Sequence, residues 1–441
     1  MTDPSHPPPS RREWLLLASA YATQFVASSF FSVALVAILR GQGLSLTQLG
    51  WIYLLGLVPG LKFLWAPLID RYGFGRHGHY RAWLCLMQAL LILTLAALAC
   101  LDVRTDVSIS LRLLILGCVA VALLTACQDI AADGLACRLL GPQQRGLGNA
   151  LQMAGGMVGF AMGGGGVLMI HQAWGWRTAI ACLIVINGIT LALALGYREP
   201  AWARPARDAH DRSMYEYWKQ LVQFWRRPDT GWHWALLIAT VQAGVCMAYG
   251  VLTPMLLEQG WKAGKIGRVV NVYGSAISVC ATLALGWSMR RWSPRQVMRW
   301  MLPAQVLAVL SLGVPLLMRM GDAWVLLGIA GYLALYMPLG VLISVLMMSR
   351  ASARSPATDF SMQYGLYSCA GFLASALALP LAQYGGYGVS LAVAAMLCLL
   401  VCFLVPCLLR YAEKAGYEQS RAWPLEHGQV RALAACKRQQ E

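Results

Sequence analysis

Apolar stretches long enough to cross a lipid bilayer recur along almost the whole of this 441-residue chain. A transmembrane helix needs about 20 residues. Only 12% of the residues are charged, against roughly a quarter in soluble proteins. The pattern predicts an all-α membrane protein with twelve transmembrane helices. The predicted spans are Trp14–Leu39, Leu46–Leu68, Trp83–Leu101, Leu113–Cys137, Gly146–His171, Thr178–Tyr197, Trp234–Leu257, Ile266–Met289, Trp300–Met318, Trp324–Met348, Ala357–Gln383 and Leu391–Leu409.

Basic residues are distributed unequally between the two sides of these spans. With the N-terminus inside, the cytoplasmic segments hold 26 of the 35 Lys and Arg residues, and the outer segments hold eight. Cytoplasmic loops of membrane proteins carry such an excess. We therefore expect a multi-pass protein of the bacterial inner membrane with both termini in the cytoplasm. The net charge of +16 then follows from topology and from contact with the anionic lipid bilayer, and no nucleic-acid partner is expected.

The cysteines and histidines argue against a metal centre and against an enzyme. Thirteen cysteines lie mostly inside apolar spans, without a CxxC pair or the Cys/His spacing of a metal site. A membrane-embedded acyltransferase or protease would need a His/Asp, Ser/His or His/Glu cluster at one membrane depth. The seven histidines lie mostly near the termini or in loops. We expect no metal, no cofactor and no catalytic residues.

The longest polar interruption, Arg198–Gly231, divides the chain into two halves. Within it, Met214–Trp225 places aromatic and aliphatic side chains at helical spacing between basic residues, which is typical of a helix on the membrane surface. We expect a disordered cytoplasmic N-terminus, a six-helix bundle, a cytoplasmic linker with an amphipathic helix, a second six-helix bundle and a cytoplasmic tail. Their residues are 1–13, 14–197, 198–231, 232–409 and 410–441.

A short internal repeat supports this division. Gln42-Gly43-Leu44 precedes Leu49-Gly50, and the same pattern returns 217 residues later as Gln259-Gly260-Trp261 before Ile266-Gly267. Two pseudo-symmetric six-helix bundles are the architecture of major-facilitator transporters, in which the solute binds between the halves near the bilayer midplane. We expect this fold, in a monomer.

Three ionisable residues fall inside predicted spans, where charge is costly and therefore marks candidate functional sites. Asp129 and Asp133 are four residues apart on one helical face, and Lys62 lies about two turns inside the second span. Two such close carboxylates do not both ionise cheaply, so the pair is a candidate proton-coupling site. Lys62 is a candidate contact for an anionic solute. Alternatively, the acids form structural pairs with Lys62, Arg138 or Arg145.

The loop after the second span, Asp70-Arg71-Tyr72-Gly73-Phe74-Gly75-Arg76, resembles the loop motif of major-facilitator transporters. In that family the acid meets the N-terminus of helix 11 and latches the cytoplasmic gate of the outward-open state, which suits the helix dipole. The resemblance implies gating roles for Asp70, Arg71 and Arg76. Asp359, at the start of the eleventh span, is assigned to the same gate. Ala66 stands where the family motif usually has Gly.

Uncharged polar residues inside the other spans are candidates for solute binding. Isolated polar residues in membranes also serve as hydrogen-bonding contacts between helices, and that alternative stays open for each of them. The candidates are Gln24, Gln128, Asn149, Gln152, Gln242, Asn271, Tyr273, Gln363, Tyr364 and Tyr367.

The segment Leu61–Tyr72, taken together with Gln128-Asp129-Ile130 and Asp133, resembles the AmpG-like branch of the major-facilitator permeases. That branch includes muropeptide importers, acetyl-CoA transporters and RhtX/FptX-type siderophore permeases. Asp133-Gly134-Leu135-Ala136 is similar to the siderophore-permease form. The resemblance implies proton-driven uptake of a pyochelin-like siderophore or ferri-siderophore by alternating access.

A muropeptide or acetyl-CoA permease is the main alternative to siderophore uptake. For either of these anionic solutes we expect more cationic residues in the cavity than Lys62 alone. The partners implied are therefore a small-molecule solute, protons and the lipid bilayer.

Overall fold

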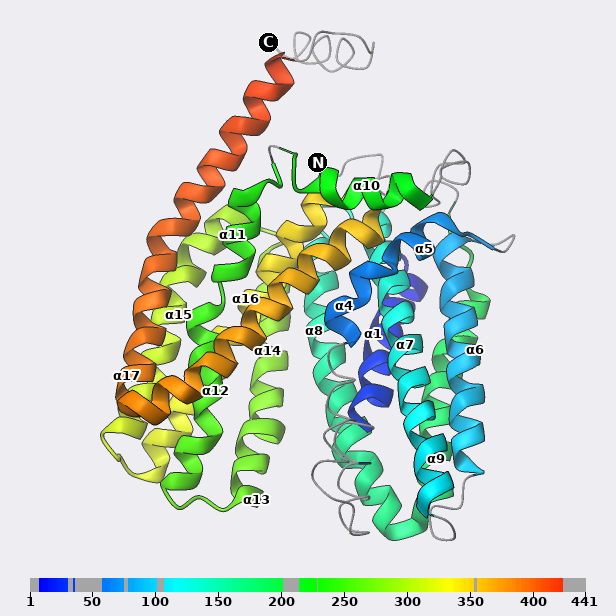
Figure 1. The fold of residues 1–441 in the computed structure, drawn as a ribbon, viewed down its shortest axis with the longest axis horizontal. Helices are drawn as coiled ribbons and strands as arrows, with labels where there is room; N and C mark the ends of the chain where they lie inside the picture. Colours follow the sequence, from blue (N-terminus) through cyan, green and yellow to red (C-terminus); the bar gives the residue numbers. More distant parts are fainter. Residues whose placement is uncertain are drawn as a thin grey trace.

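The computed structural model describes residues 8–30, 35, 58–74, 78–100, 107–200, 214–227, 229–352 and 355–422. These residues form helices and connecting turns, with no β-strand among them. Two helical bundles lie side by side (Figure 1). The N-terminal bundle contains α1 (Arg11–Ser29), α4 (Val58–Leu61), η3 (Lys62–Leu64), α5 (Ala66–Arg71), α6 (His79–Ala99), α7 (Val107–Leu139), α8 (Arg145–Phe160), η4 (Ala161–Gly166) and α9 (Val167–Gly196). The C-terminal bundle contains α11 (Trp232–Thr240), α12 (Ala243–Glu258), α13 (Ala263–Ile266), η7 (Gly267–Tyr273), α14 (Gly274–Ser288), α15 (Pro294–Leu317), α16 (Asp322–Arg350) and α17 (Pro356–Ala422).

Eight helical segments of the described chain are long and apolar enough to cross a membrane. Two of them, Arg145–Gly196 and Pro356–Leu409, are 52 and 54 residues long, which is twice the length of one crossing. Each turns back at a glycine with positive φ, Gly175 at 82° and Gly386 at 81°, a conformation that other residues rarely adopt. Each segment therefore holds two predicted spans. The first two predicted spans, and the first copy of the 217-residue repeat, fall wholly or partly outside the described residues.

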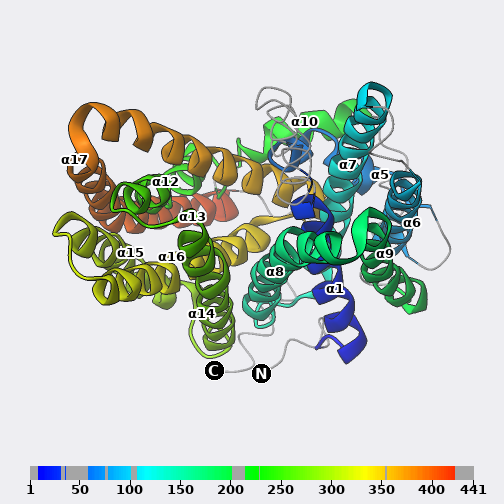
Figure 2. The ribbon, with the colours of Figure 1, turned by 90° about the horizontal axis from the view of Figure 1, so that it is seen from below.

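The two halves pack against each other at one end of the molecule. One apolar core contains residues of both halves, among them Tyr80 and Trp234, whereas a second core, around Phe30 and Leu183, belongs to the N-terminal half alone. Helix α8 lies between α1 and α14 (Figure 2). A Cβ atom on Gly286 of α14 would lie 2.4 Å from that of Ala150 in α8, so only glycine permits this approach. We call this α8–α14 contact the seam.

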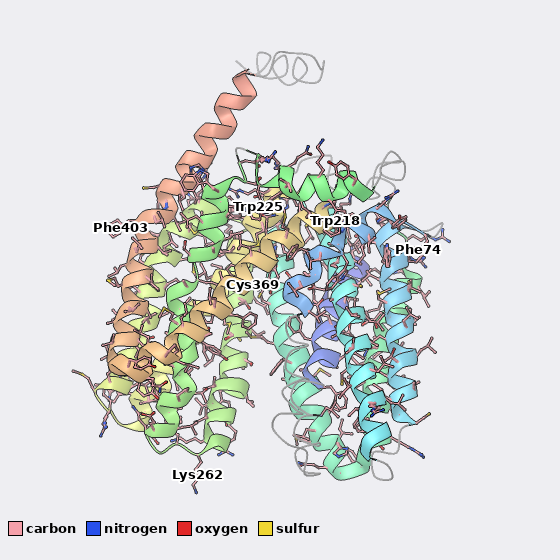
Figure 3. All side chains as sticks on the ribbon, viewed as in Figure 1. Phe74, Trp218, Trp225, Lys262, Cys369 and Phe403 are labelled. Carbon is pink, nitrogen blue, oxygen red and sulfur yellow. The ribbon has the colours of Figure 1, made fainter. Side chains whose placement is uncertain are left out.

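The linker helix α10 (Met214–Phe224) lies across the end of the bundles at which both ends of the described chain emerge (Figure 1). Tyr215, Trp218 and Val222 are exposed, whereas Phe224 is buried. Figure 3 shows Trp218 and Trp225 at this end and Lys262 at the opposite one. Helix α17 continues to Ala422, beyond the predicted bundle end at residue 409. Residues 410–422 contain no proline to end the helix, and their Ala, Glu, Lys, Gln and Arg residues favour a helical backbone.

Candidate functional site

A break in the second membrane helix turns Lys62 toward the protein interior. Between α4 and α5 the backbone forms a short 3₁₀ turn, Lys62–Leu64, and Pro67 lies in the first turn of α5. Proline has no amide hydrogen and therefore cannot continue the hydrogen bonding of a preceding helical turn. Lys62 is consequently 0% exposed although it lies in an otherwise apolar segment.

The Lys62 ammonium group lies between the two predicted acids of α7. Lys62 Nζ is 2.6 Å from Asp129 Oδ2 and 2.8 Å from Asp133 Oδ2. Asp133 Oδ1 also accepts a hydrogen bond from Gln152 Nε2 at 2.8 Å, and Asp133 is completely buried. Asp129 Oδ1 has no hydrogen-bond partner, and the Asp129 side chain retains 13% exposure. The Asp129 side chain is thus the more exposed of the two acids, although its Oδ1 atom is itself buried. We call these three ionisable residues the acid–lysine triad.

The net charge of the triad allows it to accept a proton. With all three groups ionised, the triad carries a net charge of −1 in a buried site, where an uncompensated charge costs several kcal/mol. A proton on one carboxylate makes the triad neutral. The arrangement therefore allows Lys62 to be paired in either state, while the second carboxylate gains or loses a proton.

The triad also contacts the C-terminal half through Tyr364 of α17. Lys62 Nζ lies 5.2 Å from the centre of the Tyr364 ring, within the range of a cation–π interaction. Close to this contact, a Cβ on Gly365 would lie 2.8 Å from the Gly60 carbonyl oxygen. Helix α4 and helix α17 thus meet backbone to backbone next to the charged group. A change in the position of Lys62 would therefore act directly on a contact between the two halves.

Tyr364 also lines a cavity of about 260 Å³ that lies mainly within the C-terminal half. Its lining is aromatic and uncharged, with polar atoms from amide, hydroxyl and thiol groups. Gln242 Nε2 donates to the Tyr367 carbonyl at 2.6 Å, which fixes the amide at the cavity wall. The lining residues are Met153, Gln242, Cys246, Tyr249, Tyr336, Met337, Gly340, Tyr364, Tyr367, Ser368, Gly371, Phe372 and Ser375.

Asp70 joins the two halves at the end that carries α10. Its Oδ2 accepts hydrogen bonds from Thr358 N at 2.7 Å and Thr358 Oγ1 at 2.6 Å, and its Oδ1 accepts from Tyr80 OH at 2.6 Å. Thr358 lies in the first turn of α17, where free amide groups and the helix dipole favour a carboxylate. The contact has the geometry that the loop resemblance implies, and the gating role itself stays a prediction.

These features can be compared with known proteins. The family model described as Major Facilitator Superfamily matches residues 17–379. The chain belongs to the major facilitator superfamily. Its fold is also that of solved transporters of this superfamily. A proton:xylose symporter, XylE, aligns with a TM-score of 0.67 and 13% identity, over 90% of this chain and 95% of that chain. A bacterial homologue of ferroportin in an outward-facing state aligns with a TM-score of 0.63 and 17% identity, over 92% of this chain and 100% of that chain.

Among curated proteins, this superfamily member resembles AmpG-type permeases. It is 30% identical over 257 residues to the anhydromuropeptide permease of Escherichia coli (strain K12), covering 57% of this chain and 50% of the relative. The putative transporter AmpG 4 of Rickettsia felis is 23% identical over 57% of this chain and 60% of the relative. The chain thus spans about half the length of the curated relatives that it matches. It therefore has the family and the fold of membrane transporters, and over 57% of its length it resembles AmpG-type permeases.

Several predicted solute ligands of this transporter instead hold helices together. Gln128 is fully buried and donates to the Ala20 carbonyl at 2.9 Å and to Thr23 Oγ1 at 3.0 Å, which holds α7 on α1. Gln363 is fully buried and accepts a hydrogen bond from Trp234 Nε1 at 2.7 Å. Both amides face neighbouring helices in this structure, and solute contact stays a prediction for both residues.

Three other predicted solute ligands lie away from the lining of the aromatic cavity. Asn149 is buried and donates to the Arg145 carbonyl at 2.8 Å, within its own helix. Tyr273 is 60% exposed and does not line the cavity. Gln24 is buried, and its Oε1 has no hydrogen-bond partner. The side chain of Asn271 and the whole of Arg76 lie outside the described part of the chain.

The predicted gate residues Arg71 and Asp359 do not bridge the halves here. The Arg71 guanidinium lies 5.0 Å from the ring of its neighbour Tyr72. Asp359 Oδ2 accepts from Ser352 N at 2.8 Å and lies 3.9 Å from Arg227 Nη1. Among the described residues, these contacts tie the end of the linker to the C-terminal half. These contacts of Asp359 lie within the C-terminal half and the linker, and its gating role stays a prediction.

Two groups of site residues were missed by sequence reasoning. Tyr80 and Thr358 complete the contacts of Asp70, and Tyr249 and Tyr336 line the cavity. Tyrosine and threonine carry no charge in an apolar span and are common in membrane helices, so their residue type did not mark them. Tyr80 lies four residues after Arg76, beside the loop motif, and that position was the one available signal.

Proposed function

We propose that this protein is a proton-linked permease that imports a muropeptide-like solute across the bacterial inner membrane. The observation that carries the solute class is the 30% identity to the anhydromuropeptide permease over 257 residues. These relatives support the muropeptide alternative better than siderophore uptake, which rested on the form of residues 133–136. The proposed orientation, with both termini in the cytoplasm, agrees with the basic residues of the predicted inner loops.

The acid–lysine triad supplies the proposed coupling step. Asp129, the more accessible acid, takes up a proton from the periplasmic side and releases Lys62 from one of its two partners. Lys62 then pairs with Asp133 alone, and its contact with the Tyr364 ring changes. Because α4 and α17 meet at Gly60 and Gly365, this movement biases the contact between the halves toward opening on the cytoplasmic side.

The aromatic cavity supplies the proposed solute site. A muropeptide joins sugar rings to a short peptide, and sugar rings pack on aromatic faces while their hydroxyl groups form hydrogen bonds. Tyr249, Tyr336 and Tyr367 offer such faces, and Gln242 and Ser368 offer polar groups. No lysine or arginine is among the described residues that line the cavity, contrary to what we expected for an anionic solute. Lys62, whose Nζ lies 5.2 Å from the centre of the Tyr364 ring, is the cation proposed to meet a carboxylate of the peptide.

Uptake by proteoliposomes that contain the full chain tests this proposal. A labelled anhydromuropeptide, a labelled ferri-siderophore and labelled acetyl-CoA are each offered with and without an inward proton gradient. We expect accumulation of the muropeptide alone, and loss of accumulation when a protonophore is added. Accumulation of the ferri-siderophore without the muropeptide would instead establish the siderophore assignment. Equal muropeptide uptake with and without the gradient would rule out the coupling.

A further inference from the structure

A cluster of arginine and tryptophan residues lies where α14 ends and α15 begins, at the same end of the molecule as α10 (Figure 1). Residues 287–300 read WSMRRWSPRQVMRW, with four arginines, three tryptophans and no acid. All three tryptophans are exposed: Trp287 by 54%, Trp292 by 50% and Trp300 by 71%. This turn lies apart from the residues that line the aromatic cavity, so its exposed aromatic and basic groups have no part in that site.

Four side chains of this segment border an open surface cavity of about 420 Å³: Trp292, Gln296, Arg299 and Trp300. The local fold explains the arrangement. Ser293 and Gln296 form a reciprocal capping box that starts α15, with Pro294 in its first turn. Gln296, Arg299 and Trp300 are then spaced by three and four residues on one helical face, which directs them to the same side. On the preceding turn, the Arg291 guanidinium lies 5.3 Å from the centre of the Trp287 ring.

The surroundings favour a lipid headgroup as the occupant. Arginine binds phosphate oxygens with its planar fork of N–H donors. Tryptophan is enriched where the hydrocarbon of a bilayer meets its headgroups. The cavity lies at the point where two apolar helices of membrane-spanning length meet, so its occupant would have a polar head beside a bilayer. No salt bridge neutralises Arg290, Arg291 or Arg299 among the described residues.

We propose that Trp292, Gln296, Arg299 and Trp300 form a binding site for the headgroup of an acidic phospholipid, with Arg291 on the preceding turn as a second source of positive charge. The site adjoins the seam, because Met289 of the same turn would meet a Cβ on Gly146 of α8 at 2.8 Å. A bound acidic lipid therefore neutralises the arginines next to the contact between the halves. The site is separate from the acid–lysine triad and from the aromatic cavity, so it does not depend on which solute is carried.

Binding of acidic lipid to the full chain tests the site. The detergent-purified protein is titrated with dioleoyl-phosphatidylglycerol or dioleoyl-phosphatidylcholine, and retained lipid is counted by native mass spectrometry. We expect the protein to retain phosphatidylglycerol in preference to phosphatidylcholine. In the double variant R291Q/R299Q, the affinity for phosphatidylglycerol should fall roughly 10- to 30-fold. The matched control is R112Q/R177Q, which removes two exposed arginines from the opposite end of the N-terminal half.

Three results would overturn the proposal. The first is equal retention of the two lipids, and the second is an equal loss of affinity in the control variant. The third is displacement of phosphatidylglycerol by millimolar inorganic phosphate, which would show a site for a soluble anion.

Native mass spectra and thermal unfolding of both variants in detergent would identify misfolding. If R291Q/R299Q misfolds, the milder variant W300L, which removes only an exposed ring, should weaken phosphatidylglycerol binding severalfold, and unchanged binding there would also overturn the site.

Discussion

The N-terminal and C-terminal halves of this transporter place different chemistry near the middle of the molecule. The N-terminal half holds three buried ionisable groups in contact, Lys62, Asp129 and Asp133. The C-terminal half supplies most of a cavity of about 260 Å³ that is lined by aromatic and uncharged polar groups. The fold is built from two similar bundles, yet the charged site lies in one half and the open space in the other. In the proposed mechanism, one half takes up protons and the other holds the solute, and Tyr364 contacts both sites.

Among the variants, we expect the largest loss of uptake and of stability when Lys62 is replaced. In Lys62→Met, two buried carboxylates lose their shared counter-charge, and breaking such a buried pair costs about 3–5 kcal/mol. We expect uptake to be abolished and the thermal unfolding temperature in detergent to fall. The control is Lys265→Met, which breaks an exposed pair with Asp322 worth about 0–1 kcal/mol. Similar small shifts in both variants would show that the triad is not a coupled buried cluster.

Replacement of Asp129 should separate coupling from folding. In Asp129→Asn the neutral Lys62–Asp133 pair remains, so we expect a stable protein. Uptake driven by a pH gradient should fall at least about tenfold, because the accessible proton acceptor is gone. Exchange of labelled for unlabelled solute, which needs no net proton movement, should persist. Asp322→Asn, at an exposed acid, serves as the control, and unchanged gradient-driven uptake in Asp129→Asn would reduce the triad to a structural role.

A weaker effect is expected where the halves are latched. Asp70→Asn removes the charge from hydrogen bonds to the start of α17, which are worth about 1.5–3 kcal/mol when one partner is charged. The gate at this end should open in a roughly tenfold larger fraction of molecules. Distances between spin labels at exposed Phe74 and Ser349 would report the change. Thr358→Val keeps the backbone donor and should shift the distances less; an equal shift would mean that the hydroxyl, rather than the helix terminus, forms the latch.

The smallest predicted effect lies in the aromatic cavity. A Cβ on Gly371 would lie 2.5 Å from Gln242 Nε2, so Gly371→Ala must displace the amide from the Tyr367 carbonyl. We expect KM for the solute to rise roughly fivefold, about 1 kcal/mol, with its pH dependence unchanged. In Gly340→Ala the new methyl meets Met153 Sδ at 3.6 Å, an ordinary contact, and KM should stay the same. If the pH dependence of KM changed in Gly371→Ala, solute binding and proton uptake would not be separate tasks of the two halves.

The sequence by itself determined the membrane fold and the residues that carry charge. Apolar length reports bilayer crossing directly, because each crossing needs about 20 residues. An ionisable residue in such a stretch is rare enough to be noticed singly, so Lys62, Asp129 and Asp133 could all be named. The amphipathic segment after Met214 was visible for a similar reason, since its periodicity is a local property.

Only the tertiary structure decided which polar groups meet each other. Gln128 and Asp129 are adjacent on α7, yet the amide faces α1 and the carboxylate faces Lys62, because successive residues of a helix point about 100° apart. The Lys62 ammonium reaches both acids from the first residue of the 3₁₀ turn at Lys62–Leu64, which joins two helices of the N-terminal half. The cavity tyrosines come from α12, α16 and α17, and a tyrosine looks the same in the sequence whether it faces lipid or an internal cavity. Their convergence depends on how the helices are rotated and packed, and no local pattern records that.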